Sequence, residues 1–183
     1  MNDVIKDNVS NVLERIASAA EKTGRRGDQI HLVAVSKLQP LEKIYEAHHA
    51  GIKVFGENRV QELLKKISES ERNLEWHLVG HLQTNKVNKV IDHVTMIQSV
   101  DSLHLIEKIS KSGQEMGLTS EVLLQINTSG ESSKFGFQPD LIFEACELVE
   151  SLTHLKVSGL MTAIGFEQAP IIFTADPNND GWQ

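Results

Sequence analysis

The chain of 183 residues contains one cysteine, few aromatic residues and no long apolar run. Because Cys146 has no second cysteine to pair with, no intrachain disulfide can form, which is typical of a reducing compartment. No apolar stretch approaches the roughly 20 residues that a membrane-spanning helix needs, and no signal-peptide pattern opens the chain. These absences predict a soluble cytoplasmic protein with no membrane association.

The chain also lacks a basic run. It carries 18 basic and 25 acidic residues, with a formal net charge of −7, so neither a nucleic-acid groove nor an anionic membrane surface is expected to be its partner. His77 and His81 are four apart, but they straddle the predicted end of a strand rather than share one helical face. We therefore expect no metal site.

The most informative pattern is the stretch 30–37, in which five of the first six residues are apolar. This predicts a strand buried on both faces, as in a parallel sheet. It ends in Ser36 and Lys37, and α/β folds bind their ligands at the carboxyl ends of such strands. The alternative is that Lys37 simply leaves the core and reaches water.

Strand and helix patterns alternate along the chain after an amphipathic helix over residues 1–23. The predicted strands are 30–37, 52–55, 75–79, 94–100, 121–126 and 155–161. The predicted helices between them are 40–50, 60–70, 82–91, 102–116 and 139–151. Short connections of this kind predict an α/β fold with a parallel sheet, either an open doubly wound sheet or a (β/α) TIM-type barrel.

Two observations bear on that choice. The dinucleotide-binding pattern Gly-x-Gly-x-x-Gly is absent from the first strand–helix turn, which weakens the doubly wound alternative. A complete eight-stranded barrel typically has about 250 residues. This chain has 183 residues and shows about six β/α units, so we predict an incomplete barrel over residues 1–162. Residues 163–183 contain two prolines and a polar run, with a possible strand only at 171–174, and are expected to form an irregular tail.

Polar and charged residues follow successive predicted strands, and a parallel barrel gathers such residues at one end. Lys37 follows the first strand, Asn58 the second and Lys134 the fifth. A lysine that is desolvated by apolar surroundings loses its proton more easily, and its amine can then form a Schiff base with a carbonyl compound. Aldolase-type chemistry and a pyridoxal phosphate anchor both fit and are not separable on these grounds.

Six ordered motifs extend the argument. They are Ala-Val-Ser-Lys (34–37), Phe-Gly-Glu-Asn-Arg-Val-Gln-Glu (55–62), His-Leu-Val-Gly-His-Leu-Gln-Thr-Asn-Lys (77–86), Ser-Val-Asp-Ser (99–102), Gln-Ile-Asn (125–127) with Ser-Lys-Phe-Gly (133–136), and Gly-Leu-Met-Thr (159–162). Over residues 1–162 this series resembles the pyridoxal phosphate homeostasis protein family, relatives of the barrel domain of alanine racemase.

The resemblance implies a single-domain barrel that holds pyridoxal 5′-phosphate as a Schiff base on Lys37. It places Asn58 and Met161 near the cofactor and makes Lys134 a loop lysine linked to cofactor handling. Members are similar to carriers or buffers in vitamin B6 and amino-acid homeostasis rather than to enzymes. The implied mechanism is release of the cofactor to a primary amine, with apo-enzymes as recipients, and we expect a monomer.

Departures from the family pattern define the alternatives. Arg59 stands where the family often has an aromatic residue, and His81 where a proline is common; both are compatible with the fold. After Thr162 no residue matches the family's later strands or its phosphate-binding segment, as in a truncated isoform. The rival hypotheses are a small racemase-like enzyme, for which Tyr45 is the only tyrosine, and a truncated isoform that binds no cofactor.

Overall fold

A six-stranded parallel sheet forms the centre of the molecule. The computed structural model describes residues 3–71, 74–131, 134–166 and 169–172. The strands are β1 (Val33–Val35), β2 (Val54–Glu57), β3 (Glu75–Leu78), β4 (Met96–Val100), β5 (Ser120–Gln125) and β6 (Leu155–Met161). They lie side by side in chain order, each parallel to the next. A doubly wound sheet reverses its strand order partway, so this order confirms the barrel type, here as an incomplete barrel.

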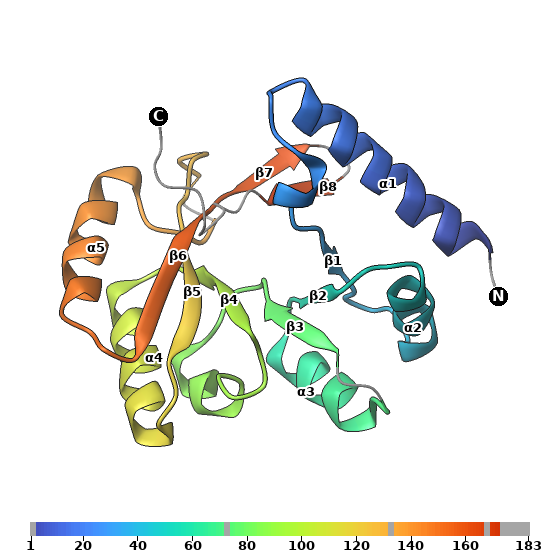
Figure 1. Cartoon of the computed structure of the whole chain (residues 1–183). Coiled ribbons are helices and arrows are strands. Elements are labelled where there is room, and N and C mark those ends of the chain that lie inside the picture. The colour runs from blue at the N-terminus through green and yellow to red at the C-terminus, as the bar shows by residue number, and fades with distance from the viewer. Residues whose placement is uncertain (1–2, 72–73, 132–133, 167–168, 173–183) are drawn as a thin grey trace.

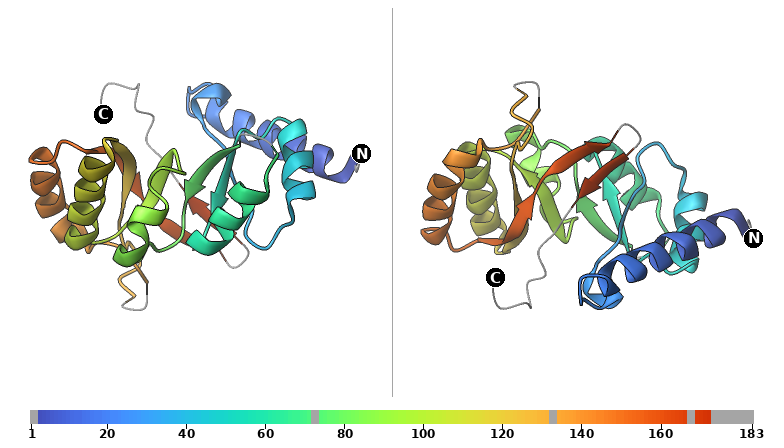
Figure 2. Two further views of the ribbon diagram at one scale, coloured as in Figure 1. Left: turned by 90° about the horizontal axis from the view of Figure 1, so that it is seen from below. Right: turned by 90° about the horizontal axis from the view of Figure 1, so that it is seen from above.

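Helices alternate with these strands, because each parallel connection has to return to the start of the next strand. The α-helices are α1 (Asp3–Glu21), α2 (Leu41–His49), α3 (Val60–Glu69), α4 (Leu103–Met116) and α5 (Ile142–Glu150), and the 3₁₀ helices are η1 (Gly27–Gln29), η2 (Thr84–Lys89) and η3 (Pro139–Leu141). Figure 1 shows α2 to α5 around the outside of the strands. Figure 2 shows α1 beyond them, against η1 and α2.

The main hydrophobic core lies between the sheet and its outer helices. Phe55 of β2 and Trp76 of β3 are both buried there, with ring centroids 5.8 Å apart. From the helices, Leu63 and Ile106 are fully buried against the same cluster. Burying side chains of this size stabilises the fold by about 1.5–3 kcal/mol each. Because these side chains hold the strands against the helices, they also hold the ends of the strands in place.

Two predicted elements differ from the structure. The strand predicted at 30–37 is restricted to Val33–Val35, because only these residues pair with β2, and Val35 is 40% exposed rather than buried. The helix predicted at 82–91 is the 3₁₀ helix η2. Asparagine and β-branched residues, which have low helix propensity, make up much of η2.

Beyond β6 the chain forms an antiparallel hairpin, β7 (Ala163–Phe166) with β8 (Ala169–Ile172). The sequence predicted an irregular segment here, with at most one strand at 171–174, of which residues 173 and 174 lie outside the described residues. The domain boundary at residue 162 stays a prediction. Among the helices that the structure describes, none combines the length and the apolar character needed to cross a bilayer.

Candidate functional site

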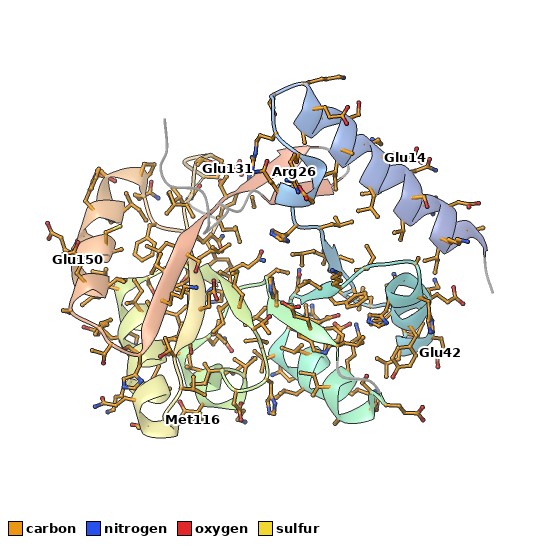
Figure 3. The ribbon with its side chains drawn as sticks, viewed as in Figure 1. Glu14, Arg26, Glu42, Met116, Glu131 and Glu150 are labelled. Carbon is orange, nitrogen blue, oxygen red and sulfur yellow. The ribbon has the colours of Figure 1, made fainter. Side chains whose placement is uncertain are left out.

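The carboxyl ends of β1 to β6 lie at one edge of the sheet, called here the carboxyl edge. Parallel pairing places the segments that follow each strand along this edge. Figure 3 shows Glu131, in the loop after β5, at the opposite end of the molecule from Met116, where α4 ends after running back along the sheet. The predicted site residues Lys37, Asn58, Lys134 and Met161 all belong to the carboxyl edge.

Lys37 lies in the tight turn that follows β1. The turn is closed by a hydrogen bond from the Gln39 N–H to the Ser36 carbonyl (3.0 Å), and Leu38 has a left-handed φ of 62°. Lys37 is exposed, so the prediction of a lysine desolvated by an apolar wall is wrong for this structure. Within the described part of the chain, no hydrogen bond or ion pair engages its amine, which leaves the amine available to a ligand.

A buried polar network lies directly beneath this turn. The Lys66 ammonium donates to Glu57 Oε1 (2.7 Å), Glu62 Oε1 (2.9 Å) and the Ser36 carbonyl (2.8 Å). The Ser36 hydroxyl donates to Glu57 Oε1 (2.6 Å), and the Leu38 N–H donates to Glu62 Oε1 (2.6 Å). The hydrogen bond from Lys66 lowers the pKa of Glu62 below its ordinary value, and that from Leu38 adds to the effect, so Glu62 stays ionised.

The sequence did not reveal this network. Glu57 stands within the motif 55–62 and Lys66 within the predicted helix 60–70, and nothing in either pattern indicates that the two side chains pair. Lys66 shares a helical face with Leu63, which is fully buried, and that spacing was the available signal. A lysine on the apolar face of a helix requires a buried partner, which the carboxylate at the end of β2 provides.

Asn58 and Met161 are positioned mainly through their backbones. Asn58 is half-buried and lies so close to Gly80 that a Cβ on Gly80 would come within 2.3 Å of the Asn58 carbonyl oxygen. Met161 is buried, and its carbonyl accepts a hydrogen bond from the Ile126 N–H (2.8 Å). These contacts tie the ends of β2 and β6 to the segments that follow β3 and β5.

Lys134 lies in the loop that follows β5. The buried Asn127 organises this loop by donating to the carbonyls of Glu131 (2.8 Å) and Lys134 (3.2 Å). The Lys134 ammonium pairs with the Glu131 carboxylate (2.7 Å), and both side chains are largely exposed. Lys134 lines a pocket of about 310 Å³, together with Gln125, Ile126, Asn127, Thr128, Ser129, Phe135 and Ala163. Lys37, Asn58 and Met161 do not line this pocket.

His81, Asp101 and Phe135 join three segments of the carboxyl edge. His81 Nδ1 lies 2.7 Å from Asp101 Oδ2, and the His81 ring stacks on Phe135 with centroids 3.8 Å apart. No pattern in the sequence indicates the pairing of His81 with Asp101 or the part played by Phe135, because the three residues lie in separate segments of the chain. The stack holds the loop after β5 against the ends of β3 and β4.

Tyr45 is hydrogen-bonded at the end of the β/α units that lies opposite the carboxyl edge. Its hydroxyl donates to Ser70 Oγ (3.1 Å) and accepts from the Glu71 N–H (3.0 Å), both just beyond the end of α3. Because α3 runs back from the carboxyl edge, Tyr45 is remote from Lys37. Among the residues that the structure describes, no group of three or more potential ligands could hold a metal ion.

His77 predicts how stability depends on pH. It is buried on β3 beside Gln98, and burial lowers its pKa below the ordinary value of 6.5, although Glu75 and Glu121 oppose the shift. Below pH 6.5 the unfolded chain takes up a proton that the folded His77 does not. The free energy of unfolding therefore decreases as the pH is lowered, by at most about 1.4 kcal/mol per pH unit. Urea unfolding between pH 7.5 and 5 measures this slope. His77→Gln is expected to flatten it, whereas the same change at exposed His93 is not; equal slopes in all three proteins would contradict the prediction.

Comparisons with known proteins match this chain over most of its length. The model of the alanine racemase N-terminal domain family matches residues 8–176. The chain is 40% identical to the pyridoxal phosphate homeostasis protein of Aquifex aeolicus, over 90% of this chain and 72% of that protein. It is 38% identical to the protein of the same name from Vibrio cholerae, over 86% and 69%.

Solved structures agree with the sequence matches. The structure of PipY from Synechococcus elongatus was solved with pyridoxal phosphate bound. Its sequence is 34% identical to this chain, and the two structures superpose with a TM-score of 0.70 over 81% of this chain and 70% of that chain. An alanine racemase from Clostridium difficile has a TM-score of 0.67 at 18% identity, a likeness that concerns the fold alone.

Proposed function

We propose that this chain, which belongs to the pyridoxal phosphate homeostasis protein family, binds pyridoxal 5′-phosphate. It shares the fold of the alanine racemase N-terminal domain and acts as a carrier of that cofactor in vitamin B6 and amino-acid homeostasis. Lys37 supplies the amine that holds the cofactor as a Schiff base. Apo-enzymes that need the cofactor are the proposed recipients.

The observation that carries this proposal is the exposed amine of Lys37 at the carboxyl edge, which no group among the described residues engages. Pyridoxal phosphate carries an aldehyde, which condenses with a primary amine. Two other lysines near the carboxyl edge are engaged: Lys66 is held by three acceptors and Lys134 by Glu131. The donor set therefore fits the cofactor at Lys37.

Asn58, Met161 and Lys134 complete the proposed site. Asn58 follows β2 and is half-buried at the carboxyl edge, and Met161 ends β6 with its side chain buried beneath that edge. Lys134 is the cation of the pocket after β5, where Thr128 and Ser129 add hydroxyl groups. Its pair with Glu131 is exposed and therefore weak, so a phosphate group can replace the carboxylate as its partner.

A carrier role is favoured over racemase-like catalysis. Racemisation needs a second acid or base, placed across the cofactor ring from the anchoring lysine. Tyr45 is the only tyrosine of the chain, and it is hydrogen-bonded at the other end of the barrel units. The curated relatives are likewise named as homeostasis proteins rather than as enzymes.

Titration of the purified chain with pyridoxal phosphate tests this proposal. We expect a saturable absorbance band distinct from that of the free cofactor, and after borohydride reduction a mass increase on the peptide containing Lys37. Labelling scattered over exposed lysines such as Lys43 and Lys65 would contradict specific carriage. Exchange of an amino acid's α-proton with solvent, followed by NMR in D₂O, would instead favour the enzyme.

A further inference from the structure

We propose that Lys66, Glu57 and Glu62 are positioning residues, which fix the backbone on both sides of Lys37 and so set the direction in which its side chain leaves the turn. This inference rests on the proposed function, because Lys37 is there the residue that holds the cofactor. None of the three touches the proposed ligand. They act through the turn that carries Lys37.

The residue before Lys37 is held from two directions. The Ser36 carbonyl accepts from the Lys66 ammonium (2.8 Å), while the Ser36 hydroxyl donates to Glu57 Oε1 (2.6 Å). The Ser36 N–H is also engaged, by the Gly56 carbonyl of β2 (2.9 Å). The N–H, the carbonyl and the hydroxyl of Ser36 thus each have a partner, which restrains the chain as it enters the turn.

The residue after Lys37 is held by Glu62. The Leu38 N–H donates to Glu62 Oε1 (2.6 Å), the same oxygen that binds Lys66 (2.9 Å). Leu38 has a φ of 62°, a left-handed conformation that costs a non-glycine residue about 1–2 kcal/mol. Its side chain is 81% exposed, so packing does not impose this conformation. The hydrogen bond to Glu62 stabilises it, together with the hydrogen bond from the Gln39 N–H to the Ser36 carbonyl that closes the turn.

The convergence of these contacts separates a positioning role from a general contribution to stability. A buried ion pair often stabilises a fold no more than apolar residues of the same volume would. Lys66 and the two carboxylates nevertheless place hydrogen bonds on both residues that flank Lys37. Glu57 is fully buried, and of its two oxygens only Oε1 has a partner among the described residues, namely Lys66 and Ser36.

The test compares four proteins: wild type, Glu62→Ala, the double variant Glu57→Leu/Lys66→Met, and Lys65→Met as a control from the exposed Lys65–Glu69 pair. The double variant removes both buried charges together, so that neither is left without a partner, and thermal unfolding verifies that it folds. Two readouts follow. Hydrogen exchange reports protection of the Leu38 N–H without any cofactor, and borohydride trapping of pyridoxal phosphate reports capture by Lys37.

We expect Glu62→Ala to lose protection at Leu38. In this variant and the double variant, trapping on Lys37 is expected to slow by about tenfold to a hundredfold, the range typical of a misplaced reactive group. Lys65→Met is expected to match wild type in both readouts. Trapping at the wild-type rate in a folded variant would overturn the positioning role. Absence of trapping on Lys37 in wild type would overturn the proposed function itself, and that result is read without any variant.

Discussion

Replacing Lys37 with alanine is expected to abolish saturable binding of pyridoxal phosphate while leaving the fold intact. Lys37 is exposed, and among the described residues its amine makes no hydrogen bond or ion pair. The free energy of unfolding should therefore change by less than about 0.5 kcal/mol. The absorbance band of the bound cofactor and the borohydride-trapped adduct should both disappear, because no other group at that position can bond to the aldehyde.

Lys37→Arg separates the covalent role from the electrostatic one. Arginine keeps the positive charge, but its guanidinium stays protonated and forms no stable adduct of this kind. We expect Lys37→Arg to lose the band as completely as Lys37→Ala, whereas Lys43→Ala on the exposed face of α2 should retain it. A band that persists in both Lys37 variants would show that the cofactor is held elsewhere.

The second large effect is expected at Gly80, which follows β3. A Cβ at this position would lie 2.3 Å from the Asn58 carbonyl oxygen and 2.7 Å from the Asn58 Cα. These are backbone atoms, which cannot swing away as a flexible side chain can. Gly80→Ala should lower the free energy of unfolding by about 3 kcal/mol or more, at the upper end for overpacking, and should displace Asn58 from its place at the carboxyl edge.

Urea unfolding measures the loss, and pyridoxal phosphate titration of the folded fraction measures the displacement. Gly117→Ala provides the matched control, because Gly117 ends α4 with a φ of 68° and a Cβ there meets open space. Its substitution costs only the backbone conformation, about 1 kcal/mol. Equal losses in the two variants would contradict the steric argument for Gly80.

Much of the fold could be predicted because each unit is encoded locally. The apolar periodicity placed β6 at the observed Leu155–Met161 and set most other boundaries within about two residues. The exposure of Val35 could not be predicted in this way. Periodicity shows which residues are apolar, but whether a sheet face is covered depends on elements far away in the sequence.

The candidate site was predictable in part. The place of Lys37, Asn58 and Lys134 at the carboxyl edge was predicted correctly, because a parallel sheet gathers the residues that follow its strands at one edge, whereas their part in cofactor binding stays a prediction. Lys66 was missed because its role depends on a carboxylate nine positions earlier that meets it only after α3 folds back on the sheet. The stacking of Phe135 on His81 was likewise hidden, since it joins loops that are distant in the sequence.

The chain-order arrangement of the sheet has a consequence for synthesis on the ribosome. Each strand from β2 to β6 pairs with the one made just before it, so every new unit adds to the edge of a sheet that is already present. Each new strand is separated from the previous one by only about 17 to 29 residues, which limits the entropic cost of bringing the two together. Lys37, Glu57 and Lys66 all belong to the first two units. The polar cluster beneath Lys37 can therefore assemble while the later units are still being translated.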